Sequence, residues 1–271
     1  MNDPIIAFIG AGNMARSLVS GLLATGVPAA RLRASDPDPE QRRQLADLEV
    51  ATFDDNDAAT AGADVVVLAV KPQILGQVIE TLSVAGSQLL LSIAAGVPLA
   101  AMESRTPPGT AIVRCMPNTP ALLGAGITGL FANAAVSDTQ RQAAENILAA
   151  AGSVVWVDEE SRLDAVTAVS GSGPAYFFYL MEALIDAGET LGLDRDTATR
   201  LTLETAYGAA RMAREGTAAP AQLRANVTSP GGTTERALSI LDAHDTRAVV
   251  QQAVAGAAAR ARELAEEFGQ S

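Results

Sequence analysis

The sequence predicts an α/β fold in which a doubly wound, mostly parallel sheet is followed by an all-α domain. Two observations in the first half support the sheet. Short strand-type runs alternate there with amphipathic helical runs, the order of βαβ units. The run at residues 64–70, DVVVLAV, lacks polar alternation, as a strand covered on both faces does. After about residue 159 strand patterns end, and Ala, Leu, Arg and Glu recur at helical spacing.

The elements follow in order along the chain. The predicted strands cover residues 5–10, 31–35, 64–70, 88–94 and 111–116. The predicted helices of the same half cover residues 14–26, 39–48, 74–82 and 138–152. We therefore expect two domains, a sheet domain at residues 1–159 and a helical domain at residues 160–271.

Composition excludes several classes of protein. The 271 residues carry a formal net charge of -12, which disfavours a nucleic-acid partner because phosphate backbones are met by clustered Lys and Arg. One cysteine, Cys115, permits no internal disulfide, and no Cys/His cluster suggests a metal site, so we expect no metal and a cytoplasmic location. No secretory leader is expected, and acidic residues in the apolar run at 176–193 argue against a membrane span.

A glycine motif closes the first predicted strand and opens the helix after it. Residues 10–15 read G-x-G-x-x-A, namely Gly10, Ala11, Gly12, Asn13, Met14 and Ala15. The first glycine permits a tight turn, the second lets the backbone approach a pyrophosphate, and the alanine lets helix pack on strand. The free N–H groups at the helix start then face the anion. The motif predicts a Rossmann-like, dinucleotide-binding domain.

The end of the second predicted strand bears on the choice of dinucleotide. An acidic residue at this point binds the adenosine ribose, whereas a small hydroxyl with nearby arginines leaves room for a 2′-phosphate. Ser35 with Arg42 and Arg43 favours NADPH, and Asp36 favours NADH. We expect NADPH, with NADH as the alternative; the arginines also fit a solvated helix face.

One residue type stands out at the same edge of the predicted sheet. Lys71 is the only lysine of the chain, and it follows a buried strand at the carboxyl end, where open α/β sheets place their ligands. Pro72 suits the first position of the next helix. Two further loops, at residues 92–97 and 117–120, end strands at the same edge. Together these loops predict one ligand-binding edge.

The chain lacks the residues of several common mechanisms. The only histidine, His244, lies at a probable helix junction, where we expect a cap or a solvated side chain, and the helical half has no lysine. Alcohol oxidation needs a base to take the hydroxyl proton, and a Ser-His-Asp hydrolase needs a placed histidine, so both are disfavoured. Reduction of a C=N bond fits better, because a protonated imine is already electrophilic and the cofactor supplies the hydride.

Taken together, the sequence motifs resemble those of the pyrroline-5-carboxylate reductase family. The resemblance runs nearly from end to end through FIGAGNMA, AVKP, SIAAGV, RCMPNTPALLGAG, AVSGSGPAYFFYLMEAL and VTSPGGTT. The last two motifs are specific to the family. The resemblance implies NAD(P)H-dependent reduction of 1-pyrroline-5-carboxylate to L-proline.

The resemblance also gives a role to VTSPGGTT. If Ser229 caps a helix and Pro230 stands at its first position, the next four residues present free N–H groups to a small carboxylate at the positive end of the helix dipole. The substrate-binding residues would be Ser229, Gly231, Gly232, Thr233 and Thr234. By similarity to the family, Thr234 would be catalytic and hydrogen-bond the ring nitrogen. Ser229 and Thr233 would lie near the carboxylate.

The same resemblance implies a set of cofactor contacts. These are Gly10, Ala11, Gly12, Asn13, Met14, Ala15, Ser35, Asn56, Ala69, Val70, Lys71, Pro72, Ala94, Ala95, Gly96 and Asn226. One position departs from the family pattern. Many members carry a glutamate a few residues before the proline of the segment TAAPAQL, where this chain has Thr217. We therefore assign no catalytic carboxylate, and we do not assign the role to nearby Glu215.

The helical half is expected to need a partner. The run at residues 172–192 is apolar around most of its circumference, so one sheet domain is unable to cover it. Relatives interleave these helices in a dimer, and some form rings of dimers, so we expect an obligate homodimer. The competing functions are a β-hydroxyacid dehydrogenase, which would ordinarily use a lysine in its helical half, a reductase of another cyclic imine carboxylate, and a non-catalytic NADPH sensor.

Overall fold

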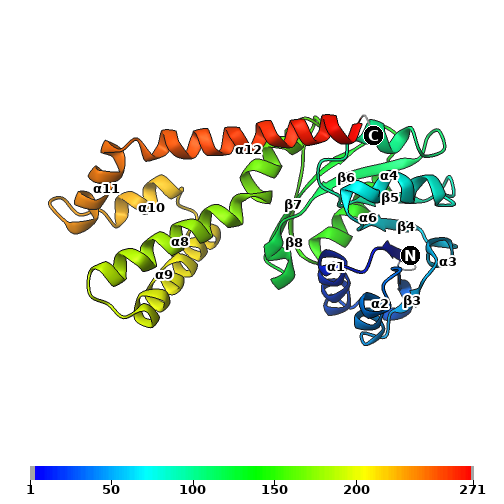
Figure 1. Cartoon of the computed structure of the whole chain (residues 1–271), viewed down its shortest axis with the longest axis horizontal. Coiled ribbons are helices and arrows are strands. Elements are labelled where there is room, and N and C mark those ends of the chain that lie inside the picture. The colour runs from blue at the N-terminus through cyan, green and yellow to red at the C-terminus, as the bar shows by residue number, and fades with distance from the viewer. Residues whose placement is uncertain (1–3, 270–271) are drawn as a thin grey trace. The chain divides into compact units, whose positions relative to one another are not determined.

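The computed structural model describes residues 4–269, which form a sheet domain and a set of long helices (Figure 1). By internal contacts the chain separates into two compact units. The sheet unit comprises the described part of Met1–Ser172 together with that of Ala257–Ser271, and the helical unit is Gly173–Gly256. The helix α12 (Thr246–Gly269) therefore begins in the helical unit and ends in the sheet unit.

The sheet unit is built on one sheet of eight strands in the order β3-β2-β1-β4-β5-β6-β7-β8. The strands are β1 (Ile6–Ile9), β2 (Leu32–Ser35), β3 (Ala51–Phe53), β4 (Val65–Leu68), β5 (Leu89–Ser92), β6 (Ala111–Met116), β7 (Gly126–Ala132) and β8 (Gly152–Trp156). Only the pairing of β6 with β7 is antiparallel within the described sheet. This confirms the predicted doubly wound, mostly parallel fold and its five predicted strands.

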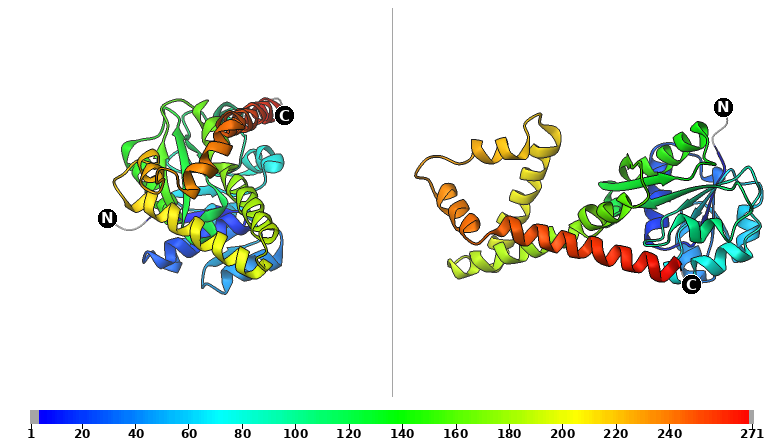
Figure 2. Two further views of the ribbon diagram at one scale, coloured as in Figure 1. Left: turned by 90° about the vertical axis from the view of Figure 1, so that its left-hand side faces the viewer. Right: turned by 90° about the horizontal axis from the view of Figure 1, so that it is seen from above.

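Helices cover both faces of this sheet (Figure 2). They are α1 (Asn13–Ala24), α2 (Pro39–Ala46), α3 (Asn56–Thr60), α4 (Pro72–Thr81), α5 (Leu99–Glu103), α6 (Asp138–Ala149) and α7 (Arg162–Val166), with short turns η1 (Ala29–Arg31), η2 (Thr119–Leu123) and η3 (Thr167–Gly171). One buried cluster joins α1, α2 and α6 to one face, and a second joins α3, α4 and α5 to the other. Alternate residues of β1 divide between the clusters, as the period of a strand requires.

Three strands were absent from the sequence prediction. β3 has only three residues and β8 alternates half-buried with exposed positions, so neither has a strong apolar run. The predicted helix at residues 138–152 ends earlier, at Ala149, because Gly152 opens β8 with a φ of 145°. A Cβ atom at Gly152 would lie 2.0 Å from the carbonyl oxygen of Gly126 on β7, so close pairing of these strands requires glycine there.

The helical unit consists of α8 (Gly173–Thr190), α9 (Arg195–Glu215), α10 (Pro220–Asn226), α11 (Thr233–Ala243) and the first part of α12. Helices α8 and α9 lie side by side and are joined by a short turn (Figure 1). Only Gly173 and Ile185 are buried on α8, whereas Tyr179 is 77% exposed. This unit thus presents a large apolar surface. Across residues 4–269, none of the helices combines the length and apolar character that a membrane span needs.

Candidate functional site

The glycine motif forms the turn between β1 and α1. Gly10 has a φ of 97°, and a Cβ atom there would lie 2.7 Å from the carbonyl oxygen of Ala69. Only glycine therefore fits at position 10 without strain. Ala11 and Ala15 are buried, which lets α1 pack closely on the sheet. The tight turn at Gly10 and the close packing at Ala15 are therefore as the motif predicted.

Gly12 plays a different part in the same turn. It is the N-cap residue of α1 and provides no side-chain cap, so the backbone N–H groups of the first turn are not capped by a side chain. No atom lies within 4 Å of the position that a Cβ would take. The start of α1 therefore offers open space and N–H donors, which is what an approaching pyrophosphate needs.

The acidic residue after β2 ties two loops together. Asp36 Oδ2 accepts the backbone N–H of Ala11 at 2.8 Å, and Asp36 Oδ1 accepts that of Asp38 at 2.9 Å. Ser35, which is fully buried, donates its hydroxyl to Oδ1 of Asn56 at 2.7 Å. Both carboxylate oxygens of Asp36 thus already have backbone partners.

The two arginines of this region lie in different environments. Arg42 donates to the carbonyl oxygens of Asp36 and Pro37 at 2.6 Å and 3.0 Å. Arg43 pairs with Glu40 on the exposed face of α2, at 2.7 Å. Of the pair, only Arg42 contacts the loop that follows β2.

A cleft of about 1060 Å³ opens at the carboxyl ends of β1, β2 and β4. The predicted cofactor residues that line it are Gly10, Gly12, Asn13, Ser35, Asn56, Ala69, Val70 and Lys71. Lys71 is the N-cap residue of α4, and Pro72 is its first residue, as predicted. Among the other lining residues are five aspartates, Asp36, Asp38, Asp54, Asp55 and Asp57. Lys71 is the one cationic side chain among the described lining residues.

The remaining predicted contacts of the sheet unit are not among the residues that line this cleft. Met14 is partly buried against the core. Pro72 lines a second cavity, of about 250 Å³, between α4 and α5. Ala94 is buried, Ala95 is exposed, and Gly96 lies next to Phe268 near the end of α12. The loop after β5 is thus packed from the side of α12.

In the helical unit, the SPGG segment adopts a structure that differs from the prediction. Ser229 does not cap α11, and Pro230 is not its first residue; the helix begins at Thr233, with Gly232 as N-cap. Instead, Gly232 donates its N–H to the carbonyl oxygen of Ser229 at 3.0 Å, and Gly231 has a φ of 71°. This is the pattern of a type II turn, with proline second and glycine third.

This turn changes which N–H groups are free to bind an anion. The N–H of Gly231 is bound by Glu235 Oε2 at 2.8 Å, and that of Gly232 is bound within the turn. The expectation that all four residues from Gly231 onward present free N–H groups is therefore wrong for the two glycines. The first turn of α11, which has no side-chain cap, retains this capacity at Thr233 and Thr234.

Four further residues singled out in the sequence lie in the helical unit. Asn226 is the last residue of α10, and its Oδ1 accepts from Gln222 at 2.8 Å. Glu215 pairs with Arg211 through two contacts, of 2.9 Å and 3.0 Å, and Thr217 is exposed just after α9. His244 is the C-cap residue of α11, in agreement with the expected helix junction.

A buried group of charges was not predicted. Arg114 on β6 has a side chain only 8% exposed and contacts Glu160 at 2.6 Å, and the same glutamate oxygen accepts the N–H of Leu99 at the start of α5. Burial raises the pKa of the Asp164 carboxyl, against the opposite effect of Arg114 and Arg262. Arg114 and Glu160 are 46 residues apart, so no short sequence motif contains both and their pairing was not predictable from local spacing.

Asn118 lies in the loop at residues 117–120 and joins two other segments by hydrogen bonds that the sequence did not predict. Its amide donates to the carbonyl oxygen of Ser170 at 3.2 Å and accepts the N–H of Ile127 at 2.9 Å. Ser170 lies in η3, a π-helical turn, a form often found at functional sites. The motifs RCMPNTPALLGAG and AVSGSGPA contain these residues, so the family motifs were the available signal. Among residues 4–269, no group of His, Cys, Asp and Glu is arranged to hold a metal ion.

A helix start without a side-chain cap, facing a cleft at the carboxyl ends of parallel strands, defines a dinucleotide-binding protein of the Rossmann class. Residues 5–96 match the family described as NADP oxidoreductase coenzyme F420-dependent, and residues 160–264 match pyrroline-5-carboxylate reductase dimerisation. The chain is 55% identical over 273 residues to the pyrroline-5-carboxylate reductase of Pseudomonas aeruginosa, with all of both chains covered. The chain belongs to the pyrroline-5-carboxylate reductase family.

Other relatives cover similar shares of the chain. The pyrroline-5-carboxylate reductase of Haemophilus influenzae is 43% identical, over 97% of this chain and 98% of the relative. The structure of the reductase from Coxiella burnetii has a TM-score of 0.93 and 44% identity, covering 97% and 99% of the two chains. That of the Plasmodium falciparum reductase with NADP bound has a TM-score of 0.86 and 30% identity, covering 98% and 99%.

Proposed function

We propose that this protein catalyses the NADPH-dependent reduction of 1-pyrroline-5-carboxylate to L-proline, the last step of proline biosynthesis. The observation that carries the proposal is the 55% identity to a named reductase along the whole chain. The glycine turn and the cleft supply the physical support, because they provide a place for a dinucleotide in the sheet unit. Such an enzyme is an oxidoreductase that acts on a CH-NH group.

The residues present fit a dinucleotide. Gly12 leaves the space that a Cβ would otherwise restrict, and the first turn of α1 has no side-chain cap. Asn13 and Met14 would donate their N–H groups to the pyrophosphate, and Ser35, Asn56 and Lys71 would surround the nucleoside parts. When bound, NADPH supplies the hydride; NADH is the alternative donor. The relative with NADP bound and the NADP oxidoreductase match at residues 5–96 support NADPH.

The start of α11 would hold the substrate. The N–H groups of Thr233 and Thr234 lie at the positive end of the helix, which favours a carboxylate. The Thr234 hydroxyl would hydrogen-bond the ring nitrogen and so orient the imine carbon, while Ser229, Gly231 and Gly232 would shape the carboxylate site. His244 caps the opposite end of α11, roughly 15 Å along the helix from Thr234, so it is not a candidate acid for this nitrogen.

We assign distinct parts to the two predicted domains. Residues 1–159 would bind the dinucleotide, with Asn226 as an added contact from the helical part, and residues 160–271 would bind substrate and form a homodimer. The apolar side chains exposed on α8 and α9 support the dimer, since a monomer rarely leaves so large an apolar surface in water. A ring of dimers is the higher assembly we propose. Equilibrium sedimentation tests the dimer, and a folded, active monomer would exclude it.

We also propose that the protein is located in the reducing environment of the cytoplasm. The single cysteine is buried, and burial raises the pKa of its thiol, so it remains a protonated core residue. We expect no nucleic-acid or membrane partner, because the chain has a net charge of -12.

One assay separates the proposed function from its alternatives. Purified protein is mixed with NADPH and 1-pyrroline-5-carboxylate, and the cofactor absorbance is followed. Oxidation of NADPH with stoichiometric formation of proline is the expected result. Faster turnover of piperideine carboxylate would indicate a reductase of another cyclic imine. Binding of NADPH with no oxidation by either imine would indicate a sensor.

A further inference from the structure

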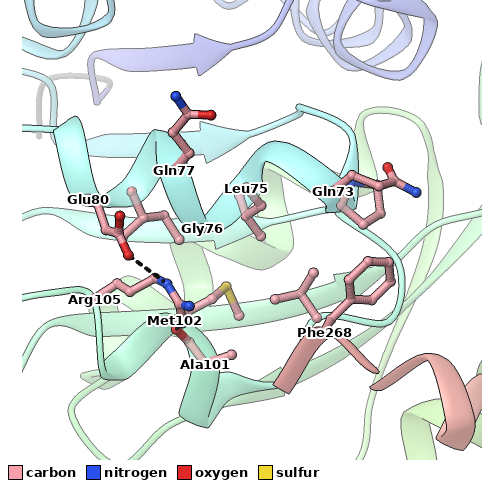
Figure 3. A pocket seen from close by; sticks show the side chains of 12 residues that line it. Gln73, Leu75, Gly76, Gln77, Glu80, Ala101, Met102, Arg105 and Phe268 are labelled. Carbon is pink, nitrogen blue, oxygen red and sulfur yellow. Dashed lines mark hydrogen bonds and ion pairs between the residues drawn. The ribbon is translucent and has the colours of Figure 1, made fainter. Parts of the chain in front are cut away.

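The last turns of α12 pack against the loop after β5 and share a cavity with the loop after β4, and both loops are predicted to hold the cofactor. Phe268 Cδ2 lies 3.3 Å from the position that a Cβ on Gly96 would occupy, and Leu264 Cβ lies 3.6 Å from it. Phe268, labelled in Figure 3, also lines the 250 Å³ cavity, whose lining includes Pro72 and Val97. One aromatic ring near the end of the chain thus lies beside both the loop after β4 and the loop after β5.

Gly96 is suited to this contact for two separate reasons. Its φ of 79° lies in the left-handed region, which side chains disfavour, and a Cβ there would make a tight contact, of 3.3 Å, with the Phe268 ring. The ring therefore packs directly on bare backbone at the end of the loop. Displacement of the ring would free the loop at that point.

The surroundings of this contact are apolar packing and a hydrogen-bonded helix start. Phe268 packs against the buried cluster that contains Val97, Leu99 and Met102. The start of α5 is fixed in turn by Glu160, which accepts the Leu99 N–H at 2.8 Å and is paired with Arg114. Figure 3 shows the Phe268 ring on the opposite side of the cavity from the Glu80–Arg105 ion pair, whose atoms are 3.1 Å apart. The loop thus contacts the Phe268 ring at Gly96 and is followed directly by a hydrogen-bonded start of α5.

We propose that Phe268 is a positioning residue for the nicotinamide end of the cofactor. It holds the loop at residues 94–97 and the start of α4 at Pro72 in the shape that accepts this end, without touching the cofactor itself. The inference rests on the proposed function. The adenosine end lies elsewhere on the sheet, because β1 and β4 separate β2 from β5. The effect of Phe268 is therefore expected on one half of the dinucleotide only.

Two ligands separate the halves in the full-length protein. NADP⁺ reaches both ends of the site, whereas 2′,5′-ADP reaches the adenosine end alone. We expect Phe268→Ala to raise the Kd of NADP⁺ by about fivefold or more, measured by titration calorimetry, and to leave the Kd of 2′,5′-ADP within about twofold. The KM for NADPH should rise in the same proportion. Phe268→Leu, which keeps an apolar side chain in place, should restore most of the affinity.

The control is Glu266→Ala, which removes an exposed side chain from the same turn of α12 and should change neither Kd. If Phe268→Ala fails to fold, the same two titrations are made with Phe268→Leu, for which a smaller change confined to NADP⁺ is then expected. Equal weakening of both ligands would indicate general destabilisation and overturn the inference, and so would no change in either. Wild-type protein that binds neither ligand would instead overturn the proposed function.

Discussion

The carboxylate of Asp36 accepts the backbone N–H of Ala11 at 2.8 Å, so the loop after β2 is hydrogen-bonded to the glycine turn after β1. In many dinucleotide-binding folds an acidic residue at this position binds the adenosine ribose. Here its second oxygen is also engaged, by the N–H of Asp38. Asp36 is the residue that favoured NADH in the sequence. In the structure both of its carboxylate oxygens accept backbone N–H groups.

Replacement of Asp36 by alanine should change both stability and cofactor choice. Loss of the hydrogen bonds should lower the free energy of unfolding by about 1–2 kcal/mol, measured in urea. Loss of the negative charge beside Ser35 should raise the ratio of kcat/KM for NADPH over NADH, because a 2′-phosphate is repelled less. Asp54→Ala is the control, since Asp54 lines the same cleft but makes neither of these contacts. A lower ratio in the Asp36 variant would contradict this account.

The two glycines of the turn should respond differently to the same substitution. Gly10→Ala places a Cβ 2.7 Å from a backbone oxygen at a φ of 97°, so it should destabilise the protein by at least about 2 kcal/mol. Gly12→Ala meets no atom within 4 Å and should change stability by less than about 0.5 kcal/mol. It should nevertheless raise the KM for NADPH, because the Cβ would block the pyrophosphate. Urea unfolding and steady-state kinetics of the pair check this; equal stability losses would argue against it.

Local geometry explains which parts of the site were predictable. The turn from Gly10 to Ala15 depends on neighbours in sequence, so its glycines could be assigned before the structure was known. The segment from Ser229 to Gly232 satisfies two local rules at once, a capped helix with proline first and a type II turn. The structure adopts the turn, and the hydrogen bond from Gly232 to Ser229 fixes that choice. The sequence alone does not indicate which of the two structures, the capped helix start or the type II turn, is the more stable.

Contacts between distant segments escaped prediction for a different reason. Arg114 and Glu160 meet only because the segment before α7 lies against β6 and the start of α5, and Phe268 reaches Gly96 only through the path of α12. Likewise, β7 becomes recognisable as a strand once it pairs with β6. The strongly apolar strands β1, β4 and β5 needed no such information, since every residue in them is buried.

Glu235 should weaken substrate binding through its charge. Its carboxylate accepts the Gly231 N–H at 2.8 Å, in the first turn of the helix that we propose binds the substrate carboxylate. Glu235→Gln keeps an acceptor for this N–H but removes the negative charge. The KM for 1-pyrroline-5-carboxylate should fall about two- to fivefold, as expected for one charge at a helix end. Asp242→Asn, near the other end of α11, should leave this KM unchanged; an unchanged or raised KM in the Glu235 variant would refute the prediction.

Asp164 should make stability depend on pH in an unusual direction. Burial raises its pKa in the folded protein, so between the ordinary aspartate pKa and the raised value the folded state binds more protons than the unfolded chain. Its contribution to stability therefore decreases as the pH rises through this window. Asp164→Asn should remove this dependence and gain stability relative to wild type as the pH rises above the ordinary aspartate pKa of about 4 in urea unfolding. The exposed Asp158, paired with Arg162 at 3.1 Å, provides a control carboxylate. A parallel pH profile in wild type and Asp164→Asn would exclude this role.

Thr234 tests the proposed chemistry most directly. It lies half-buried in the first turn of α11, where replacement by alanine should not weaken the helix, because alanine has the higher helix propensity. Thr234→Ala should nevertheless lower kcat/KM by roughly ten- to a hundredfold, corresponding to about 1–3 kcal/mol for a lost hydrogen bond to the imine nitrogen.

Two matched variants separate this hydrogen bond from carboxylate binding. Thr234→Ser keeps the hydroxyl and should recover most of the activity. Thr233→Ala removes the neighbouring hydroxyl, which we place near the carboxylate, and should raise the KM for 1-pyrroline-5-carboxylate more than it lowers kcat, because binding to the carboxylate is the same in ground and transition states. If Thr234→Ala retained wild-type kcat, the imine nitrogen would have to be held by another group, and the hydroxyl at position 234 would lose its proposed role.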